Sequence, residues 1–85
     1  MQSTTKLLTQ LLTAVPIQTL FRVHHVVNTD VLNDYKQQLE QLGFLPGESI
    51  LVQRKAPLSQ DPLVVRVGAS TYALRRAEAE CVVVA

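Results

Sequence analysis

The chain has 85 residues, a formal net charge of +1 and 47% apolar residues. A chain of this length has room for one hydrophobic core and no second domain, and its apolar content excludes a disordered protein. The small charge provides no long-range attraction for nucleic acid or an anionic membrane, and no apolar run approaches the roughly 20 residues that span a bilayer.

The first sixteen residues contain a stripe of apolar side chains. Leucine and valine recur there at the spacing of one helix face, at Leu7, Leu8, Leu11, Leu12 and Val15. Pro16 ends the pattern, because the residue before a proline disfavours helical geometry. We predict an N-terminal extension over residues 1–16 with an amphipathic helix, followed by one domain over residues 17–85. The helix either covers one end of the domain or docks through Leu8 and Leu12 on a partner or a second copy.

A strand and a helix are predicted next. Over residues 17–27, alternation places one set of side chains on one face (Phe21, Val23 and His25) and a second set on the other (Leu20, Arg22, His24 and Val26). Thr29 or Asp30 then offers a side-chain oxygen as a helix cap. The apolar positions that follow predict a helix that ends near residue 42: Val31, Leu32, Tyr35, Leu39 and Leu42.

Residues 42–48 change the pattern from helix to strand. Gly43 follows the last apolar position of the helix, where a positive φ is usual and only glycine adopts it without strain. Phe44 is then expected to pack back on the last turn of the helix. Pro46 and Gly47 fit the two central positions of a type II turn.

The rest of the chain is predicted as β structure with short connections. A strand over residues 48–55 and a loop with two prolines over 56–62 precede a hairpin. In this hairpin Gly68 opens a two-residue type II′ turn, and the register pairs Val67 with Ser70, Val65 with Tyr72 and Leu63 with Leu74.

A short helical turn at residues 75–79 and a final strand at 80–84 complete the predicted elements. Five short strands are too few for an open two-layer sandwich. We therefore expect a mainly β fold, a small five-stranded SH3-like barrel with the middle helix plugging one end.

Groups that could carry catalysis are scarce. The sequence has no glycine-rich phosphate loop and no serine or cysteine nucleophile with an evident histidine partner. We predict that the protein is not an enzyme and needs no cofactor.

His24, His25 and Cys81 are the candidate metal ligands. Adjacent residues of a strand point to opposite faces, so the two imidazoles are not expected to bind one ion together. Cys81 is expected to lie opposite the core-facing valines or partly buried at the edge of the barrel, as a small apolar filler. A single cysteine also suits a reducing cytosol.

Arg66 and Arg75 are predicted to share the outer face of the hairpin as a local positive patch. Four acidic residues in the same half of the chain dilute it: Glu48, Asp61, Glu78 and Glu80. The patch is either an ordinary solvated face or a contact for an acidic protein partner, and nucleic acid is not expected. Phe44 and Leu45 are the apolar candidates for a partner contact.

Three stretches together resemble the ferrous-iron transport protein A (FeoA) family. They are Leu42-Gly43-Phe44-Leu45-Pro46-Gly47-Glu48, then Ala56-Pro57 with Asp61-Pro62 after it, and then Tyr72-Ala73-Leu74-Arg75-Arg76 followed by Glu78-Ala79. Each stretch alone is weakly specific, and their combination at this spacing carries the resemblance.

The resemblance implies an SH3-like fold and a small cytosolic accessory protein of bacterial ferrous iron uptake. The implied partner is FeoB, a membrane permease with a cytosolic GTPase domain, through which the protein would lie peripherally at the inner membrane. The family has no accepted catalytic residues. The same barrel is the C-terminal domain of iron-dependent repressors, which leaves a metal-binding or metal-sensing domain as the alternative function. Self-association through the leucine stripe is compatible with either.

Overall fold

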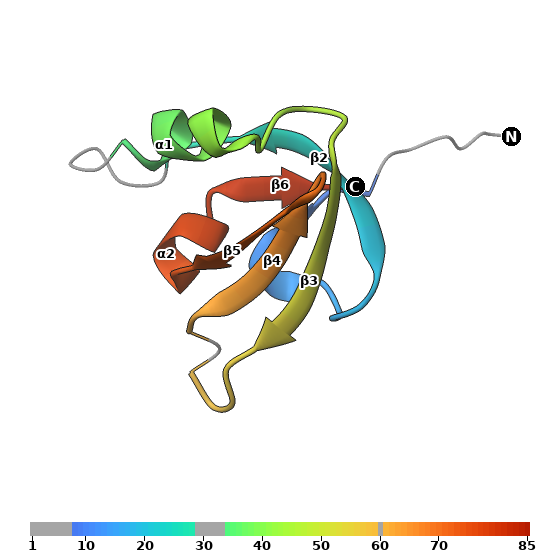
Figure 1. Ribbon diagram of the computed structural model, residues 1–85, viewed down its shortest axis with the longest axis vertical. Coiled ribbons are helices and arrows are strands. Elements are labelled where there is room, and N and C mark those ends of the chain that lie inside the picture. The colour runs from blue at the N-terminus through green and yellow to red at the C-terminus, as the bar shows by residue number, and fades with distance from the viewer. Residues whose placement is uncertain (1–7, 29–33, 60) are drawn as a thin grey trace, which may run out of the picture.

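The computed structural model describes residues 8–28, 34–59 and 61–85 (Figure 1). Its elements follow in the order β1 (Gln10–Leu11), the 3-10 helix η1 (Leu12–Ala14), β2 (Leu20–Val26), α1 (Tyr35–Leu42), β3 (Ser49–Lys55), β4 (Leu63–Val67), β5 (Ser70–Leu74), α2 (Arg76–Ala79) and β6 (Val82–Val84). The described parts of the chain thus form a mainly β fold, as predicted, with the helix α1, the short helix α2 and the 3-10 turn η1.

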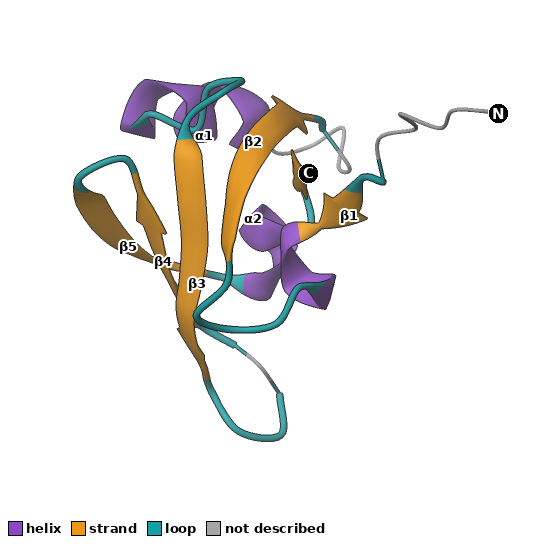
Figure 2. Cartoon of the chain, turned by 90° about the vertical axis from the view of Figure 1, so that its right-hand side faces the viewer, coloured by secondary structure: helices purple, strands orange, loops and turns teal. Residues whose placement is uncertain are grey.

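All strands belong to one antiparallel sheet, in the order β1-β6-β2-β3-β4-β5. The sheet curls around a single core, and α1 lies across one end of it (Figures 1 and 2). The sheet is an incompletely closed barrel, because β1 and β5 are its two edges. Among the described residues it has six strands where five were predicted, since β1 was not expected.

The predicted hairpin is confirmed in every pair. Val67 lies opposite Ser70, Val65 opposite Tyr72, and Leu63 opposite Leu74. Gly68 has a φ of 57°, as the first central position of a type II′ turn requires. The register puts the apolar side chains of both strands on the inner face, where Leu63, Val65, Val67 and Leu74 are buried.

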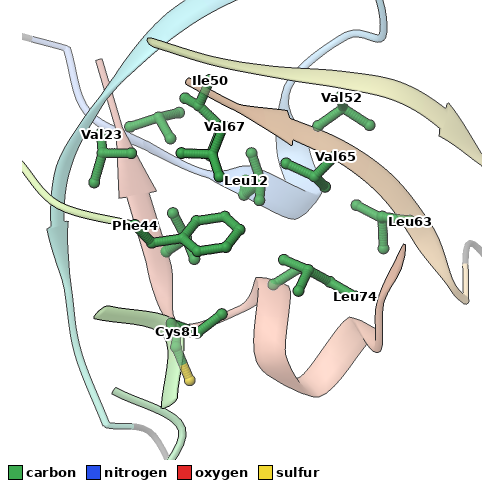
Figure 3. Packing of buried hydrophobic residues seen from close by; sticks show 14 of the residues in the cluster. Leu12, Val23, Phe44, Ile50, Val52, Leu63, Val65, Val67, Leu74 and Cys81 are labelled. Carbon is green, nitrogen blue, oxygen red and sulfur yellow. The ribbon is translucent and has the colours of Figure 1, made fainter. Parts of the chain in front are cut away.

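The core is centred on Phe44, the largest side chain that is fully buried (Figure 3). Side chains from the inner faces of β2, β3, β4 and β6 surround it, together with Leu39 from α1. The residues that face inward alternate with outward ones along β3 and β4, as expected for strands with one buried face.

Helix α1 is capped by Asp34, whose carboxylate accepts a hydrogen bond of 3.1 Å from the Gln37 amide. The predicted caps, Thr29 and Asp30, lie outside the described residues, as do Val31 and Leu32. An Asp side chain at this position satisfies one of the amide groups that the first turn of a helix leaves unpaired.

The prediction of an amphipathic helix before Pro16 is wrong for the described residues. Gln10 and Leu11 form a strand that pairs with Val84 and Val83 of β6, and a single 3-10 turn follows. A short helix is marginal in water by itself, whereas the pairing supplies backbone hydrogen bonds and lets the next residues reach the core. Residues 10–15 therefore pack as part of the barrel.

Two buried side chains and one lysine fix this segment. Leu12 and Val15 are each only 1% exposed, within the same core as Phe44. The Lys55 ammonium donates hydrogen bonds to the carbonyls of Thr13 (3.2 Å) and Val15 (2.8 Å), which ties the 3-10 turn to β3. The part of the leucine stripe from residue 8 onward thus forms no continuous exposed face, because Leu12 and Val15 are buried.

The last strand begins at Val82, two residues later than predicted. Cys81 lies in the turn between α2 and β6 and is fully buried, and Val82 beside it is buried as well. The Cys81 thiol donates a hydrogen bond of 3.5 Å to the Ala77 carbonyl. Strict alternation does not apply to this turn, so the expectation that Cys81 lies opposite the core-facing valines is wrong.

No helix within residues 8–28, 34–59 and 61–85 has the length and hydropathy needed to cross a membrane.

The pair Leu12 and Leu8 tests whether the N-terminal segment belongs to the barrel. We expect Leu12→Ala to lower the free energy of unfolding by about 2–5 kcal/mol, the usual effect of a cavity in a core. Leu8 is 73% exposed, so Leu8→Ala should change the free energy of unfolding by less than about 0.5 kcal/mol. Urea unfolding followed by circular dichroism measures both. Equal effects of the two substitutions would contradict the observed packing.

Candidate interaction surface

A cross-strand row on the outer face of the sheet combines apolar side chains with a cation. Leu20 of β2 lies opposite Leu51 of β3, Leu51 lies opposite Arg66 of β4, and Arg66 lies opposite Thr71 of β5. Residues directly opposite each other in an antiparallel sheet have Cβ atoms about 4.5–5.5 Å apart, so these side chains are neighbours. We call Leu20, Leu51 and Arg66 the outer row.

A shallow groove of about 250 Å³ lies along the outer row, lined by Leu20, Ser49, Ile50, Leu51, Arg66 and Gly68. Leu20 is 65% exposed, and Leu51 is partly exposed beside it. The Arg66 guanidinium is exposed, and its Nε donates a hydrogen bond of 3.4 Å to the Gly68 carbonyl. The surface can therefore receive an apolar side chain and place a cation next to it.

Some predicted contact residues are not available to a partner. Phe44 is fully buried, and Leu12 is buried in the same cluster. Phe44 packs against Tyr72 with ring centroids 6.0 Å apart. An aromatic residue directly after the helix-ending glycine was expected to fold back, and it does so completely.

The other predicted contact residues are exposed but scattered. Leu8 is the first residue that the structure describes, and Leu45 lies in the turn after α1. Arg66 belongs to the outer row, whereas Arg75 precedes α2 and does not line the groove. The structure thus brings Arg66 together with two leucines that the sequence analysis did not select.

Leu20 and Leu51 could have been found from the sequence. Alternation along residues 48–55 places Leu51 on the face opposite to that of Ile50 and Val52. A leucine at an outward position of a strand points to a contact surface, because such positions are usually polar in a sheet with one buried face. The pairing of Leu51 with Leu20 and Arg66 required the sheet order, which the sequence did not provide.

The turn glycines have the backbone geometry that was predicted. Gly43 has a φ of 108°, its amide donates to the Glu40 carbonyl, and the Phe44 amide donates to the Leu39 carbonyl at 3.0 Å. This is the Schellman arrangement that ends many helices. Gly47 has a φ of 92°, and the Glu48 amide donates to the Leu45 carbonyl, which confirms the type II turn.

The two histidines do not lie on opposite faces as predicted. His24 and His25 are both exposed, and their Nδ1 atoms are 2.7 Å apart. The pairing of β2 with β6 contains an irregularity between Val23 and His25 that interrupts the alternation. Cys81 is buried, and the described residues contain no group of three or more His, Cys, Asp or Glu side chains placed to hold a metal ion.

Comparison of the sequence with models of protein families shows which family the chain belongs to. The model of the FeoA domain matches residues 10–85. The chain belongs to the FeoA family. The match includes residues 10–16, which agrees with their packing in the barrel, and FeoA proteins are linked to ferrous iron transport.

Solved structures of FeoA proteins have the same fold. FeoA of Stenotrophomonas maltophilia, a prokaryotic SH3 domain protein solved in complex with zinc, is 34% identical with a TM-score of 0.78, over 93% of this chain and 91% of that one. Iron(II) transport protein A of Clostridium thermocellum is 29% identical with a TM-score of 0.73, over 88% of this chain and 44% of that one. These matches confirm the SH3-like fold.

A repressor shares the fold at lower identity. IdeR of T. acidophilum is 17% identical with a TM-score of 0.73, over 96% of this chain and 36% of that one. Identity at this level shows a common architecture alone. No match was found among curated protein sequences.

Substitution of Gly43 tests whether the turn has a purely structural role. A Cβ at Gly43 would meet no atom within 4 Å, so only the positive φ opposes a larger residue. We expect Gly43→Ala to lower the free energy of unfolding by about 1–2 kcal/mol, and Gly43→Asn by less, because asparagine tolerates this region. The exposed Gln41→Ala is the matched control in the same helix end. If Gly43→Ala were as mild as Gln41→Ala in urea unfolding, backbone strain would not explain the glycine.

Proposed function

We propose that the protein is a small accessory of bacterial ferrous iron uptake that acts by binding the cytosolic part of a FeoB-type GTPase-permease. Membership of the FeoA family supports a role in ferrous iron transport. In this proposal the protein works in the cytoplasm, at the inner membrane through its partner, and does no chemistry itself. FeoA is not a known enzyme family, and its members are small SH3-like proteins.

The observation that carries the proposal is the outer row. Leu20 keeps 65% of its surface exposed on a regular part of the sheet, where its inner neighbours already fill the core. An apolar side chain in that position gains free energy only when another molecule covers it. Arg66 beside Leu51 favours a partner segment that combines an apolar side chain with a carboxylate, because a guanidinium pairs with carboxylates bidentately.

The charge of the chain fits a protein partner better than nucleic acid. With a net charge of +1 the chain has an excess of only one cation, too small to displace many counterions from a phosphate backbone. Arginine is enriched at protein interfaces, whereas most other charged residues are depleted at their centres.

The test is direct binding to the cytosolic domain of a FeoB-type permease from the same genome. We expect Leu20→Ser and Arg66→Ala each to weaken binding about tenfold or more, which corresponds to ~1.4 kcal/mol. Isothermal titration calorimetry measures the affinity. Both residues are exposed, so unfolding midpoints should stay close to those of the wild type.

Leu58→Ser is the matched control. Leu58 is a fully exposed leucine in the loop between β3 and β4, and it does not line the groove. Its substitution should leave the affinity unchanged if the outer row is the contact. Failure of the wild-type protein to bind the permease domain would refute the proposed partner, whereas equal losses for Leu20→Ser and Leu58→Ser would refute the surface.

A further inference from the structure

The two edges of the sheet differ in length. β1 at one edge has only two residues, whereas β5 at the other edge has five. β5 is the outermost strand on its side of the sheet (Figure 2). An edge strand of this length leaves backbone amides and carbonyls without a partner in the sheet, which makes it a template for another strand.

The hairpin register determines which backbone groups point to the free edge of β5. Val67 and Ser70 flank the two-residue turn, and a pair in this position exchanges both of its backbone hydrogen bonds. Every second residue from Ser70 onward therefore bonds to β4, and the N–H and C=O groups of Thr71 and Ala73 point away from the sheet. In the part of the chain that the structure describes, no loop, cap or side chain supplies a hydrogen bond to these groups.

The β5 edge also lacks the features that usually keep edge strands from pairing. Residues 70–74 contain no charge, proline or glycine, and the pairing of β5 with β4 runs without a bulge. Natural edge strands are commonly blocked by charged side chains, proline or bulges. Thr71 and Ala73 are small and exposed. An added strand would therefore meet neither charge repulsion nor bulky side chains at these two positions.

We propose that the β5 edges of two copies of the chain pair antiparallel about a two-fold axis. Thr71 of each copy lies opposite Ala73 of the other, and the two Tyr72 residues face each other on the axis. Both Thr71–Ala73 pairs are of the hydrogen-bonded kind, so the contact forms about four backbone hydrogen bonds and leaves the pairing of β5 with β4 intact. The two sheets join into one.

The backbone on either side of β5 selects this register. A shift in one direction would place Thr71 opposite Arg75 of the second copy. The Arg75 amide already donates to the Glu78 carboxylate at 2.8 Å, and the Arg75 carbonyl accepts from amides of α2. A shift in the other direction would place Ala73 opposite Ala69, which lies in the hairpin turn. Only the pairing of Thr71 with Ala73 gives all the free groups of both edges a partner within a strand.

The side chains near the axis fit a second copy of the chain. Tyr72 packs partly against the core, donates a hydrogen bond of 3.1 Å to the Leu42 carbonyl and remains partly exposed. The two Tyr72 residues form a non-hydrogen-bonded pair, in which opposite side chains are closest and aromatic pairs stabilise a sheet. Arg66 lies opposite Thr71 of its own chain and would have Ala73 of the second copy beyond it. The arginines of the two copies thus stay apart.

The dimer contact is separate from the proposed permease contact. The outer row lies on β2, β3 and β4, whereas the dimer uses the backbone edge of β5. Failure of the permease domain to bind would therefore leave the dimer unaffected. Five residues per chain bury less surface than the about 1,200 Å² of a stable interface, so we expect a weak dimer that forms at high concentration.

Sedimentation velocity of the full chain, from micromolar to millimolar concentration, measures the dimer. We expect Ala73→Pro to weaken dimerisation about tenfold or more, because each copy loses one hydrogen-bond donor at the edge. The Ala73 amide has no partner in the monomer, so the unfolding midpoint should stay close to that of the wild type. Leu20→Ser on β2 is the control and should leave the dimer unchanged.

Two double variants make the test independent of proline. Thr71→Lys/Ala73→Lys places like charges opposite each other across the axis and should abolish the dimer. Thr71→Glu/Ala73→Lys places a carboxylate opposite an ammonium group in the proposed register and should keep it. Equal dimerisation of these two variants would overturn the proposed register.

Amide hydrogen exchange on the wild type locates the contact. The Thr71 and Ala73 amides should exchange more slowly as the protein concentration rises, whereas the Tyr72 amide, which already bonds to β4, should change little. A monomer at every concentration, or a dimer in which the Thr71 and Ala73 amides stay unprotected, would overturn the proposal. Protection that appears only when the permease domain is added would overturn the second copy as the occupant of the edge.

Discussion

The fold depends on how the chain leaves α1. The positive φ of Gly43 turns the backbone so that the Phe44 ring enters the centre of the core, and the Phe44 amide at the same time closes the helix on the Leu39 carbonyl. The turn that follows is joined to β2 as well, because the Gly47 amide donates to the Val23 carbonyl and the Val23 amide donates to the Glu48 carbonyl. One segment therefore sets the positions of α1, β2 and β3 relative to each other.

Two irregularities in strand pairing then bend the sheet. The first is the bulge at His24 in β2, and the second is a register shift between Val52 and Arg54 in β3. Both lie beyond the regular stretch in which Leu20 pairs with Leu51 and Leu51 pairs with Arg66. The outer row therefore keeps the regular pairing that makes its side chains neighbours, while β2 bends beyond it and both histidines are exposed.

Features set by local geometry could be predicted from the sequence. The hairpin around Gly68 and the Schellman turn at Gly43 rest on residues a few positions apart, and glycine at a required positive φ is a strong signal. The N-terminal leucines also match a helix period, and only their pairing with β6, some seventy residues away, decides for a strand and a 3-10 turn. The side that His25 faces depends on the same distant strand, so alternation alone gave the wrong answer.

Because repressors share this barrel at low identity, the architecture alone does not fix the function. The inward residues are explained by packing around Phe44, so the functional signal must come from side chains that packing leaves unexplained. Leu20 is such a residue. Full burial of a leucine is worth about 1.5–3 kcal/mol, so a partner that covers the 65% of Leu20 that is exposed could gain roughly five- to thirtyfold in affinity from this one contact. A surface that carries Leu20, Leu51 and Arg66 in register can therefore supply useful binding energy from few residues, as a small accessory protein requires.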